Sequence, residues 1–234
     1  ESTAGAIWDY LTTQKHFSHN VVYVAGGNTN YKNSAAAGEF NISGSAHTWS
    51  SAASGTAGNP VTWTNILSLD KDKSLALQGA VVQTGTGITF PATQSASSDA
   101  NTLDDYEEGT FTPIIQGGST AGTGTYAAQT GRYTKIGRTV NVIGWVDWTA
   151  HTGTGTLQIG GLPFTTSGTV GSYSPATIWV DRSLTLTASN IAQGMAAINS
   201  TYISIGQYPL GGGTYSMVNM DTDAGLIFNL TYFV

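Results

Sequence analysis

The densest chemistry in this sequence is a run of acidic side chains near its middle. Five of the chain's 14 acidic residues fall in one short segment: Asp99, Asp104, Asp105, Glu107 and Glu108. Glycoside hydrolases use paired carboxylates as acid and base, so Asp104/Asp105 and Glu107/Glu108 are candidate pairs. Like charges this close repel one another and need solvent, a metal or basic neighbours. Because the run has no apolar periodicity, we interpret it as a charged connection, which Arg132, Lys135 and Arg138 would neutralise.

Tryptophan beside aspartate is a second pattern with chemical meaning. Asp147 lies between Trp145 and Trp148, and Asp181 follows Trp179 by two positions. An indole ring stacks on the apolar face of a pyranose, while a carboxylate accepts hydrogen bonds from its hydroxyl groups. The same tryptophans also suit a hydrophobic core. The sequence leaves both interpretations open.

Two further groups have the residue types of metal ligands. His16 and His19 are three positions apart and would meet on one turn of a helix. Two histidines are too few for a site in one chain, although three copies around an axis would supply six. Asp221 and Asp223 lie in the sequence MDTDAG, which lacks the rest of a calcium loop. We therefore predict neither a metal nor a cofactor.

A serine hydrolase motif is not present. Ser167 lies in a turn-like stretch, but Thr165 and Thr169 occupy the positions where a nucleophile elbow has glycine. We predict no catalytic residues, and a polysaccharide-cleaving enzyme remains the alternative.

The composition bounds the possible partners. Charged residues make up 9% of the 234 residues, against about 25% in ordinary globular domains. The net charge of −6 argues against binding to a nucleic acid backbone, which needs a basic surface. No apolar run is long enough to span a membrane, so we expect no membrane insertion. The absence of cysteine excludes disulfides and cysteine-based zinc sites.

Residues 1–94 are predicted to form a small β-rich module. Ile7, Tyr10 and Leu11 have the spacing of a short helix within residues 4–17, and a strand fits this segment equally well. Strands are predicted at 21–25, 38–42 and 47–50. Alternating residues at 61–69 and 74–82 predict a hairpin around the polar turn 70–73. Pro91 cannot donate to a ladder and should end a strand.

Residues 95–110 are predicted to be an acidic linker, and residues 111–234 an antiparallel β-sandwich or jelly-roll domain. Short strands separated by glycine-rich turns favour these folds. The predicted strands are 111–116, 131–136, 139–149, 155–159, 176–180, 184–187, 202–206, 215–218 and 226–234. Gly137 and Arg138 should form a tight turn. The whole chain is therefore expected to be all-β.

Two of these strands carry apolar residues on both faces. Successive side chains of a strand point to opposite faces. In the strand 139–149, Ile143 and Trp145 then lie on the face opposite the other apolar residues. In the strand 226–234, Ile227 and Phe233 do the same. A monomeric sandwich does not need apolar residues on the face of its sheet that contacts solvent. We predict that these four residues form an interface between identical chains, and the pattern does not distinguish a dimer from a trimer.

A longer stretch resembles a known family. The sequences GITFPATQSASSDANTLDDYEEGTFTP (87–113), GRYTKIGRTVNV (131–142) and GLPF (161–164) are similar to a region near the C-termini of bacteriophage tail-fibre and tailspike proteins. This resemblance covers residues 87–164. It implies a homotrimeric fibre fragment of the virion tail, located outside the cell, attached to other tail proteins, and binding a glycan or protein on a bacterial surface.

The residues that would contact such a receptor are expected among aromatic side chains in the C-terminal half. We select Tyr173, Trp179, Tyr208 and Tyr215, because loops at one end of a sandwich are the common location of binding residues. A polysaccharide depolymerase and a purely structural fibre or capsid-decoration segment are the two alternatives to a receptor-binding protein.

Overall fold

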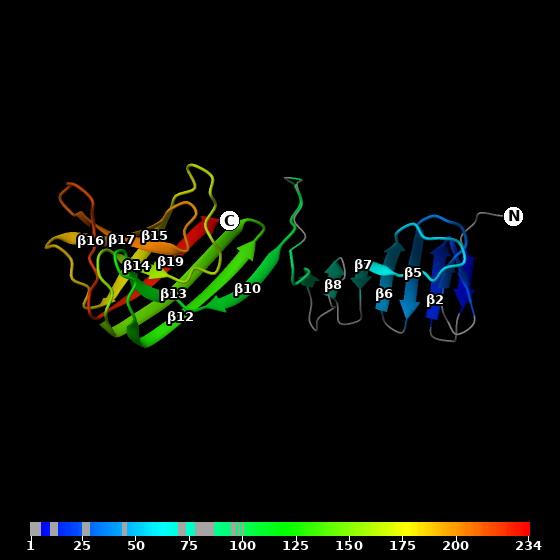
Figure 1. The fold of residues 1–234 in the computed structure, drawn as a ribbon, viewed down its shortest axis with the longest axis horizontal. Helices are drawn as coiled ribbons and strands as arrows, with labels where there is room; N and C mark the ends of the chain where they lie inside the picture. The colour runs from blue at the N-terminus through cyan, green and yellow to red at the C-terminus, as the bar shows by residue number, and fades with distance from the viewer. Residues whose placement is uncertain are drawn as a thin grey trace. The chain divides into compact units, whose positions relative to one another are not determined.

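A computed structural model describes residues 6–9, 14–24, 29–43, 46–69, 74–77, 87–94, 97, 99 and 101–234. These residues form strands and connections but no helix, which confirms the predicted all-β class. The chain divides into two compact units, Glu1–Asp104 and Asp105–Val234 (Figure 1). No helix long and apolar enough to cross a bilayer occurs in the described ranges.

The N-terminal unit contains a seven-stranded sheet in the order β1-β2-β5-β6-β7-β8-β9 and a separate pair, β3-β4. Its strands are β1 Ala6–Asp9, β2 Gln14–His19, β3 Val21–Tyr23, β4 Thr29–Tyr31, β5 Ala37–Ser43, β6 Ala46–Ala52, β7 Thr64–Leu69, β8 Ser74–Leu77 and β9 Gly87–Thr89. Strands β1 and β2 pair in antiparallel fashion, so the strand alternative for this segment is correct and the helix alternative is wrong. The predicted pairing of β7 with β8 is confirmed, while its turn at 70–73 lies outside the described residues.

The described residues of the N-terminal unit include one buried cluster. Val21, Tyr31, Ala37 and Ala52 form its buried cluster. Elsewhere in the unit, the ring of Phe40 on β5 packs against Trp49 of β6, with ring centroids 4.7 Å apart. Among the described residues, this buried cluster is smaller than that of the C-terminal unit.

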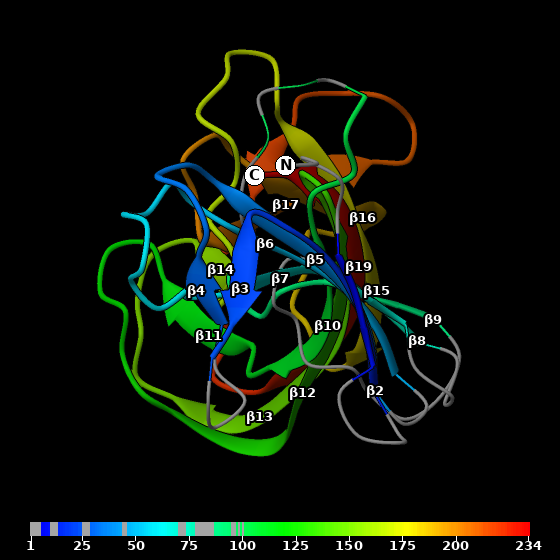
Figure 2. The ribbon, with the colours of Figure 1, turned by 90° about the vertical axis from the view of Figure 1, so that its right-hand side faces the viewer.

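The C-terminal unit is built from one large antiparallel sheet in the order β10-β12-β13-β19-β15-β16-β17-β14-β11, with β18 paired to β17. Its strands are β10 Tyr106–Phe111, β11 Ile114–Gly117, β12 Gly124–Ile136, β13 Thr139–His151, β14 Leu157–Gly160, β15 Ser174–Arg182, β16 Asn190–Ala196, β17 Tyr202–Pro209, β18 Ser216–Met217 and β19 Ala224–Phe233. The sheet curls so that β12 and β13 lie on one side of the unit and β16 and β17 on the other (Figures 1 and 2). The sandwich-like fold predicted for this half is confirmed.

A long hairpin forms the centre of the first layer. Strands β12 and β13 pair along most of their length around Gly137, whose φ of 55° is the left-handed conformation that suits glycine. The predicted tight turn is therefore confirmed. Alternate residues of β13, including Val142, Val146 and Trp148, point inward and are fully buried or nearly so.

Two glycines make room for aromatic rings inside this layer. Gly131 and Gly144 are directly opposite each other, between Phe111 of β10 and Phe228 of β19. A Cβ atom added at Gly144 would lie 2.4 Å from the ring of Phe228, and one at Gly131 would lie 2.5 Å from Phe111. The two rings contact each other edge to face at 6.4 Å between centroids. The glycines are therefore required by the core.

The chain changes layer between β10 and β11. The sequence predicted one strand over 111–116, whereas Thr112 and Pro113 interrupt it, and the two pieces lie at opposite ends of the sheet order. Side chains of β12 and β13 bind this corner. The Tyr126 hydroxyl accepts the Ile115 amide proton at 2.9 Å, and the Gln129 amide donates to the Pro113 carbonyl at 3.1 Å.

Two predictions for the second layer are wrong. Residues 184–187 form no strand, because the Thr185 and Thr187 amides bond to the side chains of Asp221 and Gln207 rather than to a neighbouring backbone. Strand β16 was not predicted. Its inward residues are Gly194 and Ala196, so the hydrophobic pattern that marks a strand is weak.

Candidate functional site

The outward side of β10, β12, β13, β19 and β15 is a continuous surface, which we call the outer face. The pairing register places Trp145 opposite Ile227, and Ile227 opposite Trp179, so three large apolar residues form one row across β13, β19 and β15. Ile143 and Phe233 lie on the same side of the sheet. Between 41% and 67% of each of these five residues is exposed.

All four residues predicted for an interface therefore share one face. These are Ile143, Trp145, Ile227 and Phe233. Trp179, which was predicted to contact a receptor, lies beside Ile227 on this same face. Inward-pointing Trp148, by contrast, belongs to the core, and its indole N–H donates to the Asp221 carbonyl at 3.0 Å.

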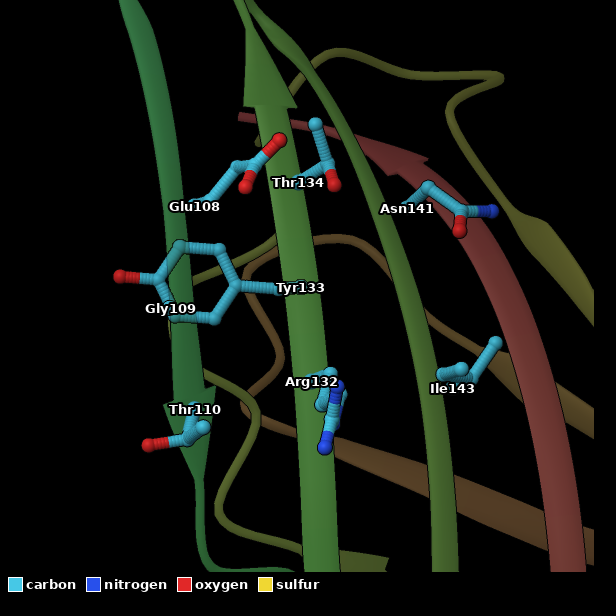
Figure 3. A pocket seen from close by; sticks show the side chains of 8 residues that line it. All are labelled: Glu108, Gly109, Thr110, Arg132, Tyr133, Thr134, Asn141 and Ile143. Atoms are coloured by element: carbon cyan, nitrogen blue, oxygen red, sulfur yellow. The ribbon is translucent and has the colours of Figure 1, made fainter. Parts of the chain in front are cut away.

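Two adjoining depressions lie on the outer face. The larger has a volume of about 430 Å³ and is lined by Glu108, Gly109, Thr110, Arg132, Tyr133, Thr134, Asn141 and Ile143. Figure 3 shows Arg132 and Thr134 of β12 between the labelled residues of β10 and those of β13. The smaller, of about 230 Å³, also includes Arg132 and Ile143 and extends to Trp145 and Ile227. Polar and apolar groups are thus mixed along one groove.

Arg132 differs from two of the other basic residues of the C-terminal unit. Lys135 is paired with Asp105, and Arg182 with Asp147 and Asp223, whereas Arg132 and Arg138 form no ion pair within the described residues. The Arg132 guanidinium is therefore available to a partner. Sequence reasoning missed this groove, although a basic residue at an outward position of an alternating strand was a usable signal.

The carboxylates of Glu107 and Glu108 lie on opposite faces of the sheet. Glu107 and Glu108 are adjacent in β10, so their side chains point to opposite faces. Glu107 accepts a hydrogen bond from Tyr133 on the inner side, and Glu108 accepts one from Tyr106 on the outer side. The bond to Glu107, together with partial burial, raises the pKa of Tyr133 to about 12. Two carboxylates on opposite faces cannot act on the same glycosidic bond.

Asp105 and Lys135 form a buried ion pair at the start of the C-terminal unit. Their side chains are 9% and 5% exposed. The interpretation that basic residues neutralise part of the acidic run is thus confirmed for Lys135. The Asp105 carbonyl also accepts the Gly137 amide proton at 2.9 Å, which fixes the chain beside the β12–β13 turn.

The remaining aspartates of interest hold the fold together. Arg182 donates to Asp147 at 2.6 Å, to Asp223 at 2.7 Å and to the Trp148 carbonyl at 2.6 Å. The hydrogen bonds that Arg182 donates to Asp147 and then to Asp223 raise the pKa of Arg182. Asp221 accepts the Thr185 amide proton. Asp147 therefore does not face a sugar groove as a free carboxylate, and the aspartates of MDTDAG are engaged by protein groups.

The histidine hypothesis fails because its helix does not exist. His16 and His19 lie in strand β2, so the helical turn on which they would meet is not formed. In the part of the chain that the structure describes, no three His, Asp or Glu side chains gather as a metal site would require.

The other predicted receptor-contact residues lie away from the outer face. Tyr173 is exposed just before β15. Tyr208 at the end of β17 and Tyr215 before β18 are in contact, with ring centroids 5.0 Å apart. These two tyrosines are seven positions apart in the chain.

Comparison with known proteins gives one structural similarity. No known protein-family model matches the chain, and no curated protein sequence matches it. The chain is similar to the crystal structure of the Dettilon tailspike protein, with a TM-score of 0.42 and 19% sequence identity. The match covers 55% of this chain and 24% of the tailspike chain, so it spans about a quarter of the tailspike's length.

Proposed function

We propose that this chain is the distal part of a bacteriophage tail fibre or tailspike that attaches the virion to a bacterial surface as a homotrimer. Its receptor is a surface glycan or an outer-membrane protein. The resemblance over residues 87–164 supports the phage assignment. The outer face carries the proposal, because it gathers Ile143, Trp145, Ile227 and Phe233 on one exposed side of a regular sheet.

Burial of these residues against identical chains would stabilise the assembly. Covering one such side chain contributes roughly 1.5–3 kcal/mol. Three copies of a weak receptor site on one rigid particle then give durable attachment, because the second and third binding events become intramolecular.

A non-enzymatic role fits the chemistry of the described carboxylates better than a depolymerase. A glycoside hydrolase needs two carboxylates about 5–10 Å apart that face one substrate. Glu107 and Glu108 face opposite sides, and Asp147 and Asp223 bind Arg182. Release of sugar from a bound polysaccharide would overturn the non-enzymatic proposal.

Binding to bacteria tests the proposed function. Fluorescently labelled protein should bind cells of some strains in a panel of bacteria and should block adsorption of phages that share the receptor. Heat-denatured protein is the control. Failure to bind any strain would contradict attachment and would favour a purely structural fibre or decoration segment.

A further inference from the structure

The second layer of the C-terminal unit carries a small aromatic surface of its own. Tyr208 is the penultimate residue of β17, and its neighbour on β16 is Ile191. Tyr215 lies across the backbone of Gly206, where an added Cβ atom would be 2.0 Å from the tyrosine ring. The two rings are tilted by 44°. We call Tyr208, Tyr215, Ile191 and the adjacent Gln193 the tyrosine platform.

The platform combines apolar rings with unused polar groups. Tyr208 is 45% exposed and Tyr215 36% exposed. Among the described residues, neither the Tyr208 hydroxyl nor the Gln193 amide has a hydrogen-bond partner. The Tyr215 hydroxyl has only the Met217 sulfur, a weak acceptor. Burial raises the pKa of Tyr215, so its hydroxyl keeps its proton at neutral pH.

No charge is available in the segment that forms the platform. Residues 183–220 contain no Asp, Glu, Lys or Arg. A charged ligand would therefore find no ion-pair partner within this segment to offset the loss of its hydration. A ligand that suits the platform has an apolar face, several hydroxyl groups and no net charge.

We propose that the tyrosine platform binds an uncharged pyranose ring of a bacterial surface polysaccharide. The proposal rests on the proposed function and specifies the class of its receptor. The C–H face of the sugar stacks on Tyr208 and Tyr215. Its hydroxyls bond to the Tyr208 hydroxyl and to the Gln193 amide, which donates and accepts.

A protein partner suits this surface less well. A tyrosine buries about 150–250 Å² when it is fully covered, and both rings here are less than half exposed. The pair therefore offers on the order of 200 Å², whereas a stable protein interface needs about 800 Å² on each side. A single sugar ring matches the smaller area.

A polysaccharide array tests the assignment. The full chain should be applied to an array of bacterial O-antigens and capsules that includes neutral and acidic repeats. We expect binding to neutral members, with an affinity that changes little between low and high salt, because no charge is involved. Binding restricted to acidic members would overturn the proposal.

Matched variants locate the site. Tyr208→Ala should lower the affinity for the bound polysaccharide about tenfold, a loss typical of an aromatic anchor. Val170→Ala changes an 88% exposed loop residue outside the platform and should leave the affinity unchanged. Equal loss in both variants, or none in Tyr208→Ala, would overturn the proposal. Unchanged circular dichroism and melting temperature would show that Tyr208→Ala is folded.

Cell binding separates this proposal from the function on which it rests. If wild-type protein binds no bacterial strain, the proposed function fails. If it binds cells but no polysaccharide, or if Tyr208→Ala binds cells as well as wild type does, only the sugar assignment fails. Cell binding that protease treatment of the cells abolishes and periodate oxidation of their sugars leaves intact would identify a protein receptor instead.

Discussion

At the scale of single residues, charge in the C-terminal unit mainly supports the fold. Lys135 and Arg182 each hold acidic side chains from other segments, and Asp221 binds a backbone amide. Arg132 on the outer face has no such role in the described chain. The two charged residues that are buried among the described ones, Asp105 and Lys135, are paired with each other.

Removal of one member of the buried pair should be costly. Lys135→Met leaves the Asp105 carboxylate buried without its partner, which typically destabilises a protein by about 3–5 kcal/mol. The double variant Asp105→Asn/Lys135→Met removes both charges and should be more stable than Lys135→Met. Urea unfolding followed by tryptophan fluorescence measures both. Equal stability of Lys135→Met and wild type would show that the pair does not hold the fold.

High pH should weaken the contact between Tyr133 and Glu107. The folded pKa of Tyr133 is about 12, above its ordinary value of 10.0, so the hydroxyl contributes stability that is complete below pH 10 and is lost as the pH rises through 12. Tyr133→Phe should therefore flatten the fall in stability over this range. Urea unfolding at several pH values tests this, with Tyr173→Phe as the control. An unchanged fall in Tyr133→Phe would contradict the assignment.

At the scale of elements, side chains close the corner where the chain changes layer. Strands β10 and β11 are consecutive in the chain but lie at opposite ends of the sheet order. Tyr126, Gln129 and His151 bond to the backbone of Pro113 and Ile115. These bonds take the place of a backbone ladder between β11 and the first layer.

Loss of the Tyr126 hydroxyl should loosen this corner. Tyr126→Phe leaves the amide of Ile115, a residue that is 2% exposed, without its acceptor, at a cost of about 1–3 kcal/mol. Hydrogen exchange of residues 113–117 should become faster, while exchange in the central strand β19 should respond less. Uniform acceleration across the sheet would show that the hydroxyl supports the whole unit and not the corner.

Strand prediction succeeded where alternation was strong and failed where it was inverted. In β13 the inward valines and Trp148 are buried while Ile143 and Trp145 are exposed, as the two-residue period requires. In β16 the larger residues Ile191 and Met195 point outward and small residues point inward, so no local pattern marks the core side.

Tertiary pairing explains most of what the sequence could not predict about the candidate site. The acidic run gave no sign that Tyr106–Phe111 forms β10. The ion pair that holds Asp105 directly before this strand involves Lys135, which is thirty positions later in the chain. The groove around Arg132 depends on three strands in register. By contrast, the outward positions of Ile143, Trp145, Ile227 and Phe233 follow from each strand alone.

At the scale of the whole molecule, the outer face is the surface that self-association would cover. Trp145, Ile227 and Trp179 form one apolar row across three of its strands, and an exposed patch of this kind commonly marks an interaction site. A homotrimer would bury it and would leave the second layer, with Tyr208 and Tyr215, free.

Solution mass tests this arrangement. Light scattering should give a mass near three times the 24.3 kDa of the chain. Ile143→Asp places a charge in the proposed interface and should shift the mass toward that of one chain, whereas Val170→Asp, at an 88% exposed loop position, should not. A wild-type monomer at micromolar concentration would contradict the trimer.

The position of Asp105 has a mechanical consequence for a particle held by its receptor. Tension that passes along the chain from the N-terminal unit enters the C-terminal unit at this residue, directly before β10. Its salt bridge and the Gly137 bond must rupture before β10 can peel away from β12. In the proposed attachment role, hydrodynamic drag on the virion would therefore load these two contacts ahead of the rest of the sheet.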